Sequence, residues 1–128
     1  NIGSSNGAFR VFKTSGNLVR SIQKGTTPDT AQTSAVSLPH KAVLSSVADI
    51  SAPSHLFRSD GSVVEDSTPD LGSGNYVDHP LNMGARSDGS SAQLDGKVYG
   101  AIVVGKKASS VDISNTEAYL AAKSGVTL

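Results

Sequence analysis

Alternating apolar and polar residues predict two β-hairpins in the first half of the chain. Apolar side chains interleave with polar ones over residues 8–13 and 18–22, and Ser15-Gly16-Asn17 separates these two runs. A second pair of short apolar runs flanks Asp60-Gly61. Because Gly-containing turns between short runs of this kind are typical of antiparallel hairpins, we expect strands on both sides of each turn.

Residues 42–50 form the longest apolar stretch of the first half, after a shorter run at residues 35–38. We predict strands here, although the longer run also fits one face of a helix. Residues 24–33, by contrast, hold mostly Gly, Thr, Pro, Asp and Gln and offer little to bury. That composition predicts a loop.

The most strand-like segment of the chain is residues 97–106, which are rich in β-branched side chains and almost continuously apolar. Such runs are typical of a buried strand, so we expect the central strand of the sheet here. Ser114-Asn115-Thr116-Glu117 matches a capping box and predicts a short helix over residues 118–123 that ends at Gly125. Residues 126–128 are long enough for a last short strand.

A long stretch from residue 65 to residue 91 is poor in apolar side chains, which are scattered among Gly, Ser, Pro and acidic residues. Long connections without secondary structure are uncommon inside a compact domain, so we predict an extended arm or loop. Within it, residues 86–90 repeat the Arg-Ser-Asp-Gly-Ser of residues 58–62. Shared turn chemistry explains this echo without an internal repeat.

Together these elements predict a mainly β fold, a small antiparallel β-sandwich or barrel with one short C-terminal helix and a long irregular excursion. At 128 residues the chain has the usual size of one domain, so we assign residues 1–128 to a single β-rich unit. Three Phe, three Tyr and no Trp supply little large apolar area. We therefore expect a thin core.

The formal charges balance, with 11 Lys and Arg against 11 Asp and Glu. Nucleic-acid binding depends on basic groups that neutralise phosphates, so we expect no nucleic-acid partner. Residues 1–64 carry six basic and three acidic groups, whereas residues 65–128 carry five and eight. Halves of opposite sign would allow head-to-tail contact, but solvation of the surface explains them more simply.

Cysteine and long apolar runs are both missing from the sequence. Without Cys there are no disulfides, thiolate nucleophiles or Cys-bearing zinc sites. No run approaches the roughly 18 apolar residues that span a bilayer. We therefore expect a soluble chain without a membrane partner.

Two short motifs resemble catalytic or cofactor-binding signatures but lack the chemistry that these need. Residues 100–107 approach the phosphate-binding loop G-x-x-x-x-G-K-[ST], yet Ile and Val replace the small residues and Lys107 replaces the hydroxyl. Ser21-Ile22-Gln23-Lys24 matches S-x-x-K without the partner motifs of that enzyme class. The acidic residues near the middle of the chain follow no calcium-binding register. We therefore predict no catalytic, cofactor-binding or metal site.

An enzyme in this chain would have to be built around one of three histidines, His40, His55 and His79. Each lies beside Pro or in a turn-like stretch, and no pair has metal-ligand spacing. We interpret them as surface or loop residues. A small hydrolase is the least favoured hypothesis, and it requires one of these rings within hydrogen-bond reach of a Ser or a carboxylate.

Without a catalytic set, the sequence favours a structural or assembly protein, such as a virion capsid decoration (cement) protein or another capsid-associated lattice protein, acting through protein–protein contacts. The thin core and the extended Ser-, Gly- and Pro-rich segments motivate this hypothesis. We expect a virion or extracellular chain that is oligomeric or lattice-bound, has other protein subunits as partners and needs no cofactor. The alternative is a small-ligand or glycan binding module on a β scaffold, although the lack of Trp disfavours sugars.

The candidate assembly contacts are basic and aromatic side chains of the first run together with two residues of the excursion: Phe9, Arg10, Phe12, Lys13, Tyr76 and Met83. On a strand, Phe9 and Phe12 point to opposite faces, so at most one of them joins the core. We expect the other to be exposed or covered by another chain. A partly covered edge of an ordinary sheet explains the same pattern without a partner.

Overall fold

The structure is a computed structural model that describes residues 6–78, 80–84 and 93–128. Its strands form two three-stranded antiparallel sheets, and one helix follows them in the chain. Sheet A contains β1 (Ala8–Lys13), β2 (Val19–Lys24) and β3 (Pro28–Gln32). Sheet B contains β4 (Leu44–Asp49), β5 (Ser54–Ser59) and β6 (Ser62–Ser67), and the helix is α1 (Ser110–Ser124).

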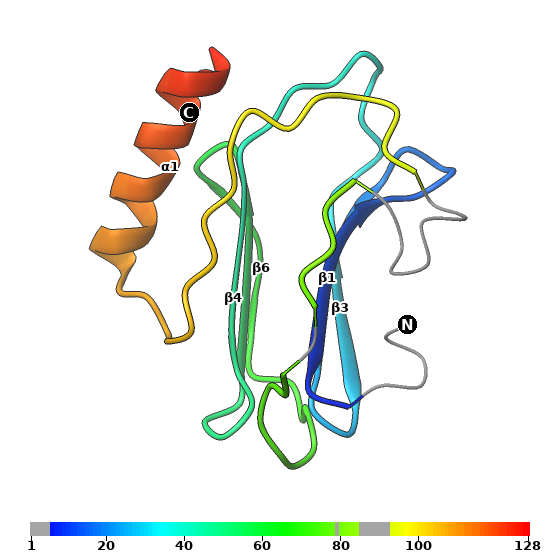
Figure 1. Ribbon diagram of the computed structural model, residues 1–128, viewed down its shortest axis with the longest axis vertical. Coiled ribbons are helices and arrows are strands. Elements are labelled where there is room, and N and C mark those ends of the chain that lie inside the picture. The colour runs from blue at the N-terminus through cyan, green and yellow to red at the C-terminus, as the bar shows by residue number, and fades with distance from the viewer. Residues whose placement is uncertain (1–5, 79, 85–92) are drawn as a thin grey trace.

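The two sheets and the helix form three layers (Figure 1). Sheet A packs against one face of sheet B, and α1 lies on the other face. The predicted mainly β sandwich with one short C-terminal helix is therefore confirmed. The sheets remain two separate layers and do not close into a barrel.

Local sequence explains the two predicted hairpins, which are both present. β1 pairs with β2 across the predicted turn, and β5 pairs with β6 across Asp60-Gly61. Asp60 and Gly61 have positive φ angles of 49° and 75°, which a tight two-residue hairpin turn requires. Glycine takes such angles without a steric penalty. The strand predicted within residues 42–50 is also present, as β4.

The predicted loop over residues 24–33 is wrong, because β3 occupies Pro28–Gln32. β3 pairs with β2 in continuous register and directs Ala31 into the interior, where its side chain is fully buried. Pro28 is the first residue of the strand, a position that tolerates its missing N–H. Pairing with an existing hairpin outweighs the weak strand propensity of these residues.

The central strand predicted at residues 97–106 is also wrong. These residues have no regular secondary structure and are exposed. Residues 126–128 and residues 35–38 form no strand either. The yellow segment in Figure 1 passes beside β4 before the chain enters α1. Strand propensity reflects packing on a pleated surface, and this segment lies where no sheet pairs with it.

Helix α1 begins earlier than the sequence predicts. Ser109 caps it, with the Ser109 hydroxyl and the Asp112 carboxylate bonding each other's backbone N–H groups in a capping box. The predicted box at Ser114–Glu117 therefore lies inside the helix, and Glu117 is buried instead of capping. The predicted end is confirmed, because Gly125 adopts the left-handed conformation and closes α1.

The predicted excursion begins as strand, since β6 extends to Ser67, and then wraps around one end of the sandwich. Leu71 is fully buried, and its carbonyl oxygen accepts a hydrogen bond from the Thr27 N–H. Gly25 permits this close approach, because a Cβ there would collide with the Leu71 oxygen. Residues 68–78 and 80–84 contain no strand or helix, and the echo at residues 86–90 lies outside the described residues.

The core is small, as the low aromatic content predicts. Its buried cluster consists of Val19, Ala31 and Phe57, with Leu44 and Val64 packed against it. This cluster occupies one end of the space between the sheets. Within the described ranges, no helix combines the length and apolar character needed to cross a bilayer.

Candidate functional site

The space between the sheets changes from apolar to polar along three strands. On β2, the inward position after Val19 is Ser21, and on β5 His55 precedes Phe57 by two residues. Strand side chains alternate between faces, so residues two apart share a face. On β3, Asp29 and Ala31 are related in the same way. One end of the interlayer is therefore apolar and the other polar.

His55 is the centre of the polar end. Its Nδ1 lies 2.6 Å from Oδ2 of Asp29, and its Nε2 lies 3.0 Å from Oγ of Ser21. Both partners belong to sheet A, whereas His55 belongs to sheet B. An Nδ1–H donor to the carboxylate and an Nε2 acceptor for the serine hydroxyl satisfy the whole ring. The two sheets are thus joined by a histidine bonded at both ends.

The network extends beyond these three residues. Oγ of Ser46 lies 2.6 Å from Oγ of Ser21, and Nε2 of Gln23 donates to Ser46 over 2.7 Å. The hydroxyl of Tyr76 donates to Oε1 of Gln23 over 2.6 Å. Tyr76 therefore connects the excursion to the polar network between the sheets. Partial burial, with a smaller contribution from the charge of Asp49, raises the pKa of Tyr76 to about 12.

The order Ser21–His55–Asp29 is the order of groups in a serine hydrolase, where a base activates the hydroxyl and a carboxylate orients the base. The geometric condition for the hydrolase hypothesis is thus met by His55. A substrate cannot reach the serine hydroxyl, however, because Ser21 and His55 are both 0% exposed. Ser21 is also held by Ser46, and a nucleophile needs open space beside its oxygen for the substrate carbonyl. The arrangement as it stands bonds the two sheets together.

A second polar contact fixes the helix to sheet B. Nε of Arg58 donates to Oε1 of Glu117 over 2.8 Å, and Nη2 donates to Oε2 over 3.0 Å. Glu117 is 1% exposed, so this two-pronged contact neutralises a buried carboxylate. The hydrogen bonds to Glu117 raise the pKa of Arg58 above its already high ordinary value. The contact between Arg58 and Glu117 therefore joins α1 to β5.

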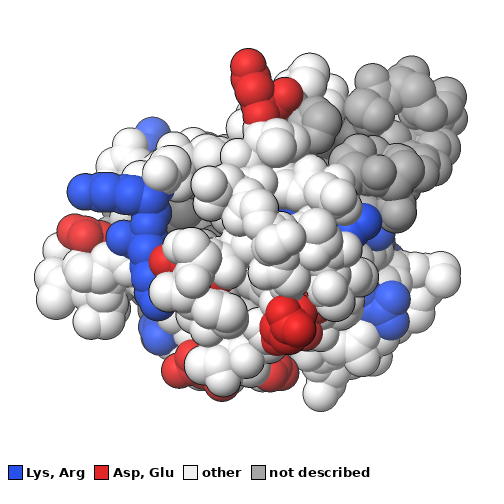
Figure 2. Space-filling view, turned by 90° about the horizontal axis from the view of Figure 1, so that it is seen from below, with Lys and Arg blue, Asp and Glu red and all other residues white. Residues whose placement is uncertain are grey.

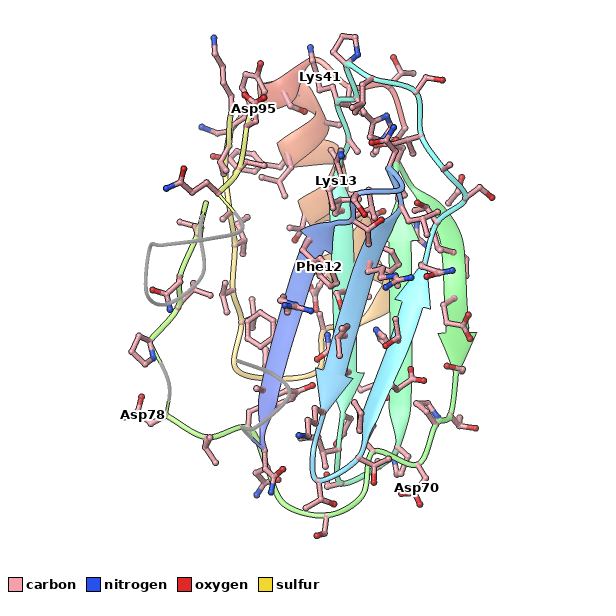
Figure 3. All side chains as sticks on the ribbon, turned by 90° about the vertical axis from the view of Figure 1, so that its right-hand side faces the viewer. Phe12, Lys13, Lys41, Asp70, Asp78 and Asp95 are labelled. Carbon is pink, nitrogen blue, oxygen red and sulfur yellow. The ribbon has the colours of Figure 1, made fainter. Side chains whose placement is uncertain are left out.

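The predicted assembly residues separate into two groups. Phe9 and Tyr76 lie together, with their rings edge to face at a centroid distance of 6.2 Å. Arg10 stacks over the ring of Phe12 at 3.9 Å on the opposite face of β1, as the predicted alternation requires. Figure 3 shows Phe12 and the neighbouring Lys13 on this edge strand. Met83 is 63% exposed.

A groove of about 650 Å³ lies between β4 and residues 102–108. Its walls are mainly apolar and include Phe9, Leu44, Tyr76, Ile102, Val103 and Leu120. Asp49, Asp112, Lys106 and Lys107 also line it, two groups of each sign. Hydrogen bonds lower the pKa of both carboxyls. The largest cause is the bond from the Ala52 backbone N–H for Asp49 and the bond from the Ser109 hydroxyl for Asp112. The lining of the groove is therefore mainly apolar, and its charged groups balance.

The other candidate groups that the structure describes do not come together in a site. His40 is exposed, and His79 lies outside the described residues. Among residues 6–78, 80–84 and 93–128, no three His, Asp or Glu side chains are placed to hold a metal ion. Residues 100–107 form no phosphate-binding loop, since they neither curl into a loop after a strand nor precede a helix directly.

Sequence reasoning missed Asp29 and the true role of Ser21. Ser21 opens the S-x-x-K match, and the same serine is the inward-facing residue between Val19 and Gln23 on β2. That alternation was the available signal, because a polar residue on the inward face of a strand must find a partner. No protein-family model, curated protein or solved structure matches this chain.

Proposed function

We propose that this protein is a structural assembly protein that acts through protein–protein contacts, as a subunit of a larger shell or lattice. The observation that carries the proposal is the exposure of apolar side chains on residues 97–105. Five of them are between 49% and 60% exposed: Val98, Tyr99, Ile102, Val103 and Val104. Contiguous exposed apolar surface on a small chain marks a contact site for another molecule.

Residues 77, 81 and 83 of the excursion expose further apolar side chains. Val77, Leu81 and Met83 are between 52% and 63% exposed, on residues without secondary structure. On the face shown in Figure 2, most basic groups gather along the left side and acidic groups stand in separate places, on a mainly uncharged surface. Apolar contact with other subunits supports this function better than electrostatic attraction does. A virion capsid, which a decoration protein would bind, or another extracellular lattice is the setting that the composition favours.

Within this proposal, the buried Ser21–His55–Asp29 array has a structural role: its hydrogen bonds hold the two sheets together. A small core of this size provides limited apolar stabilisation, and buried hydrogen-bonded groups add specificity to the packing. A fluorophosphonate probe separates this role from hydrolysis. We expect no labelling of the native chain at Ser21, and stoichiometric labelling that Ser21→Ala abolishes would overturn the assignment.

Light scattering across a concentration series tests the proposed assembly. We expect the mass of the purified chain to rise above that of one 13.0 kDa copy as concentration increases. The double variant Ile102→Ser and Val104→Ser removes apolar area from the exposed segment, and we expect association to weaken roughly tenfold or more. Val111→Ser is the matched control, because Val111 is 66% exposed on α1 and outside the segment.

A monomer at every concentration would contradict self-assembly. Equal association of the double variant and the Val111→Ser control would show that residues 97–105 are not the contact. Circular dichroism of each variant establishes that the sheets and the helix are retained.

A further inference from the structure

Strand β4 has one unpaired edge. It pairs with β5 on one side, and within the described residues no strand pairs with its other side. No backbone hydrogen bond joins β4 to residues 93–108, which the structure describes completely. An unpaired edge offers a row of free N–H and C=O groups to another strand.

The opposite sheet extends past this edge. Ser21 on β2 bonds Ser46 on β4 and His55 on β5, so β1 lies beyond β4. Phe9 and Val11 pair with Gln23 and Ser21, which places them on the inward face of sheet A. They are nevertheless 44% and 40% exposed. Sheet B is one strand too narrow to cover the inward face of β1.

Residues 99–107 run beside this vacant position in the same direction as β4 (Figures 1 and 3). At one end, Nζ of Lys41 lies 5.9 Å from the centre of the Tyr99 ring. At the other end, Nζ of Lys107 donates to Oγ of Ser54 over 3.1 Å, and its charge helps to lower the pKa of Asp49. Because Ser54 pairs with Asp49, these side-chain contacts bring residue 107 to the level of residue 49 and residue 99 to the level of residue 41, with the same offset at both ends.

The segment does not close onto β4 of its own chain. Paired strands lie about 4.8 Å apart, which leaves no space between them. Here the groove of about 650 Å³ separates β4 from residues 102–108. The segment with the strongest strand propensity and the edge that lacks a partner therefore face each other unpaired.

We propose that residues 99–107 pair with β4 of a second copy of this chain and become the fourth strand of its sheet B, opposite β1. This inference rests on the proposed function and names the partner. Donor segment and acceptor edge occur in every copy, so the pairing can be exchanged between two copies or repeated along a row of copies. The charges fit as well, because Lys107 meets Asp49 at the end of β4 in the same register.

Cross-linking tests the pairing directly, because the chain contains no Cys. The alignment places Val103 beside Ser45, so Ser45→Cys is made in one copy and Val103→Cys in an isotopically heavy copy. We expect a mixed dimer with a disulfide or a short bis-maleimide link between positions 45 and 103. The matched control replaces Val103→Cys with Val111→Cys, which exposes a thiol at a position the pairing does not use.

The double variant Ser45→Cys and Val103→Cys distinguishes pairing within one chain from pairing between chains. Links only within one chain, or no 45–103 link above the control, overturn the inference. If light scattering still detects oligomers in that case, the proposed function stands and only this partner arrangement fails. If every variant is a monomer, both fail together.

A backbone test complements the cross-link. Val103→Pro removes an N–H from the donor strand, and we expect association to fall roughly tenfold. Val103→Thr keeps the N–H and the β-branched shape, so its association should stay near that of the natural chain. Equal weakening by Pro and Thr would indicate side-chain contact without strand pairing and would overturn the inference.

Discussion

The two ends of the interlayer use the same strands but opposite chemistry. On β5, Phe57 packs between the sheets at one end, whereas His55, two residues earlier, is hydrogen-bonded at the other. Both side chains are 0% exposed. The apolar end gains from removing surface from water, a non-directional effect. At the polar end the hydrogen bonds only offset the free-energy cost of desolvating their groups, but each bond forms in one geometry alone.

The difference suggests a division of roles between the ends. Apolar packing tolerates small shifts of one sheet over the other, whereas a histidine bonded to Asp29 and Ser21 does not. We therefore expect the apolar end to supply most of the free energy of unfolding. The polar end should determine how the sheets are aligned.

The largest effect should come from Phe57→Ala. Deleting this fully buried ring leaves a cavity in a cluster that has few members, so we expect a loss of about 3–5 kcal/mol in the free energy of unfolding. Urea unfolding followed by circular dichroism measures it. Phe9→Ala is the control, because Phe9 is half-exposed and its loss should cost far less. Equal losses would place the main core elsewhere.

His55→Ala should have the second largest effect. It leaves the carboxylate of Asp29 and the hydroxyl of Ser21 without their central partner, and we expect a loss of about 2–3 kcal/mol. His40→Ala, at an exposed position, should change stability by less than about 0.5 kcal/mol. A near-neutral His55→Ala would mean that the polar end contributes nothing to alignment or stability.

Tyr76 should show the smallest effect, and it depends on pH. Its pKa in the folded chain is about 12, above the ordinary value of 10, so the folded state holds a proton that the unfolded state releases. The contribution of this proton to the free energy of unfolding is complete below pH 10 and is lost as the pH rises through 12. The absorbance of the phenolate is titrated in the natural chain and in Tyr76→Phe, and the difference between the two curves reports the ionisation of Tyr76. Tyr76→Phe also removes the bond to Gln23, for about 0.5–1 kcal/mol. A difference curve centred near pH 10 would contradict the effect of partial burial on the pKa of Tyr76.

The helix shows how much of the fold local sequence could predict. Its C-terminal end at Gly125 was predictable, since the left-handed conformation there is a property of a single residue. Its start was not, because Ser109-Asp112 and Ser114-Glu117 are both acceptable capping pairs. In the folded chain Ser109 and Asp112 form the cap, whereas Glu117 bonds Arg58, which lies 59 positions earlier on β5.

The candidate site was less predictable than the fold. Asp29 and His55 lie on strands of different sheets, and nothing within a few residues of either one indicates the other. For the exposed segment the local sequence led to a clear prediction that was wrong, because residues 97–106 have every local property of a buried strand. Local propensity does not decide whether a strand forms there. The segment runs beside the outer edge of β4, with which no strand of the described residues pairs, and it forms no backbone hydrogen bond to that edge.

The sequence by itself determined the β-rich class, the hairpin turn at Asp60-Gly61 and the end of the helix, because each depends on residues within one turn or one run. Tertiary structure alone decided that Pro28–Gln32 forms a strand, that Ser21, His55 and Asp29 meet, and that residues 97–106 remain unpaired. These outcomes depend on registers and distances between segments far apart in the chain. Local propensities differ by only about 1 kcal/mol, so such contacts override them.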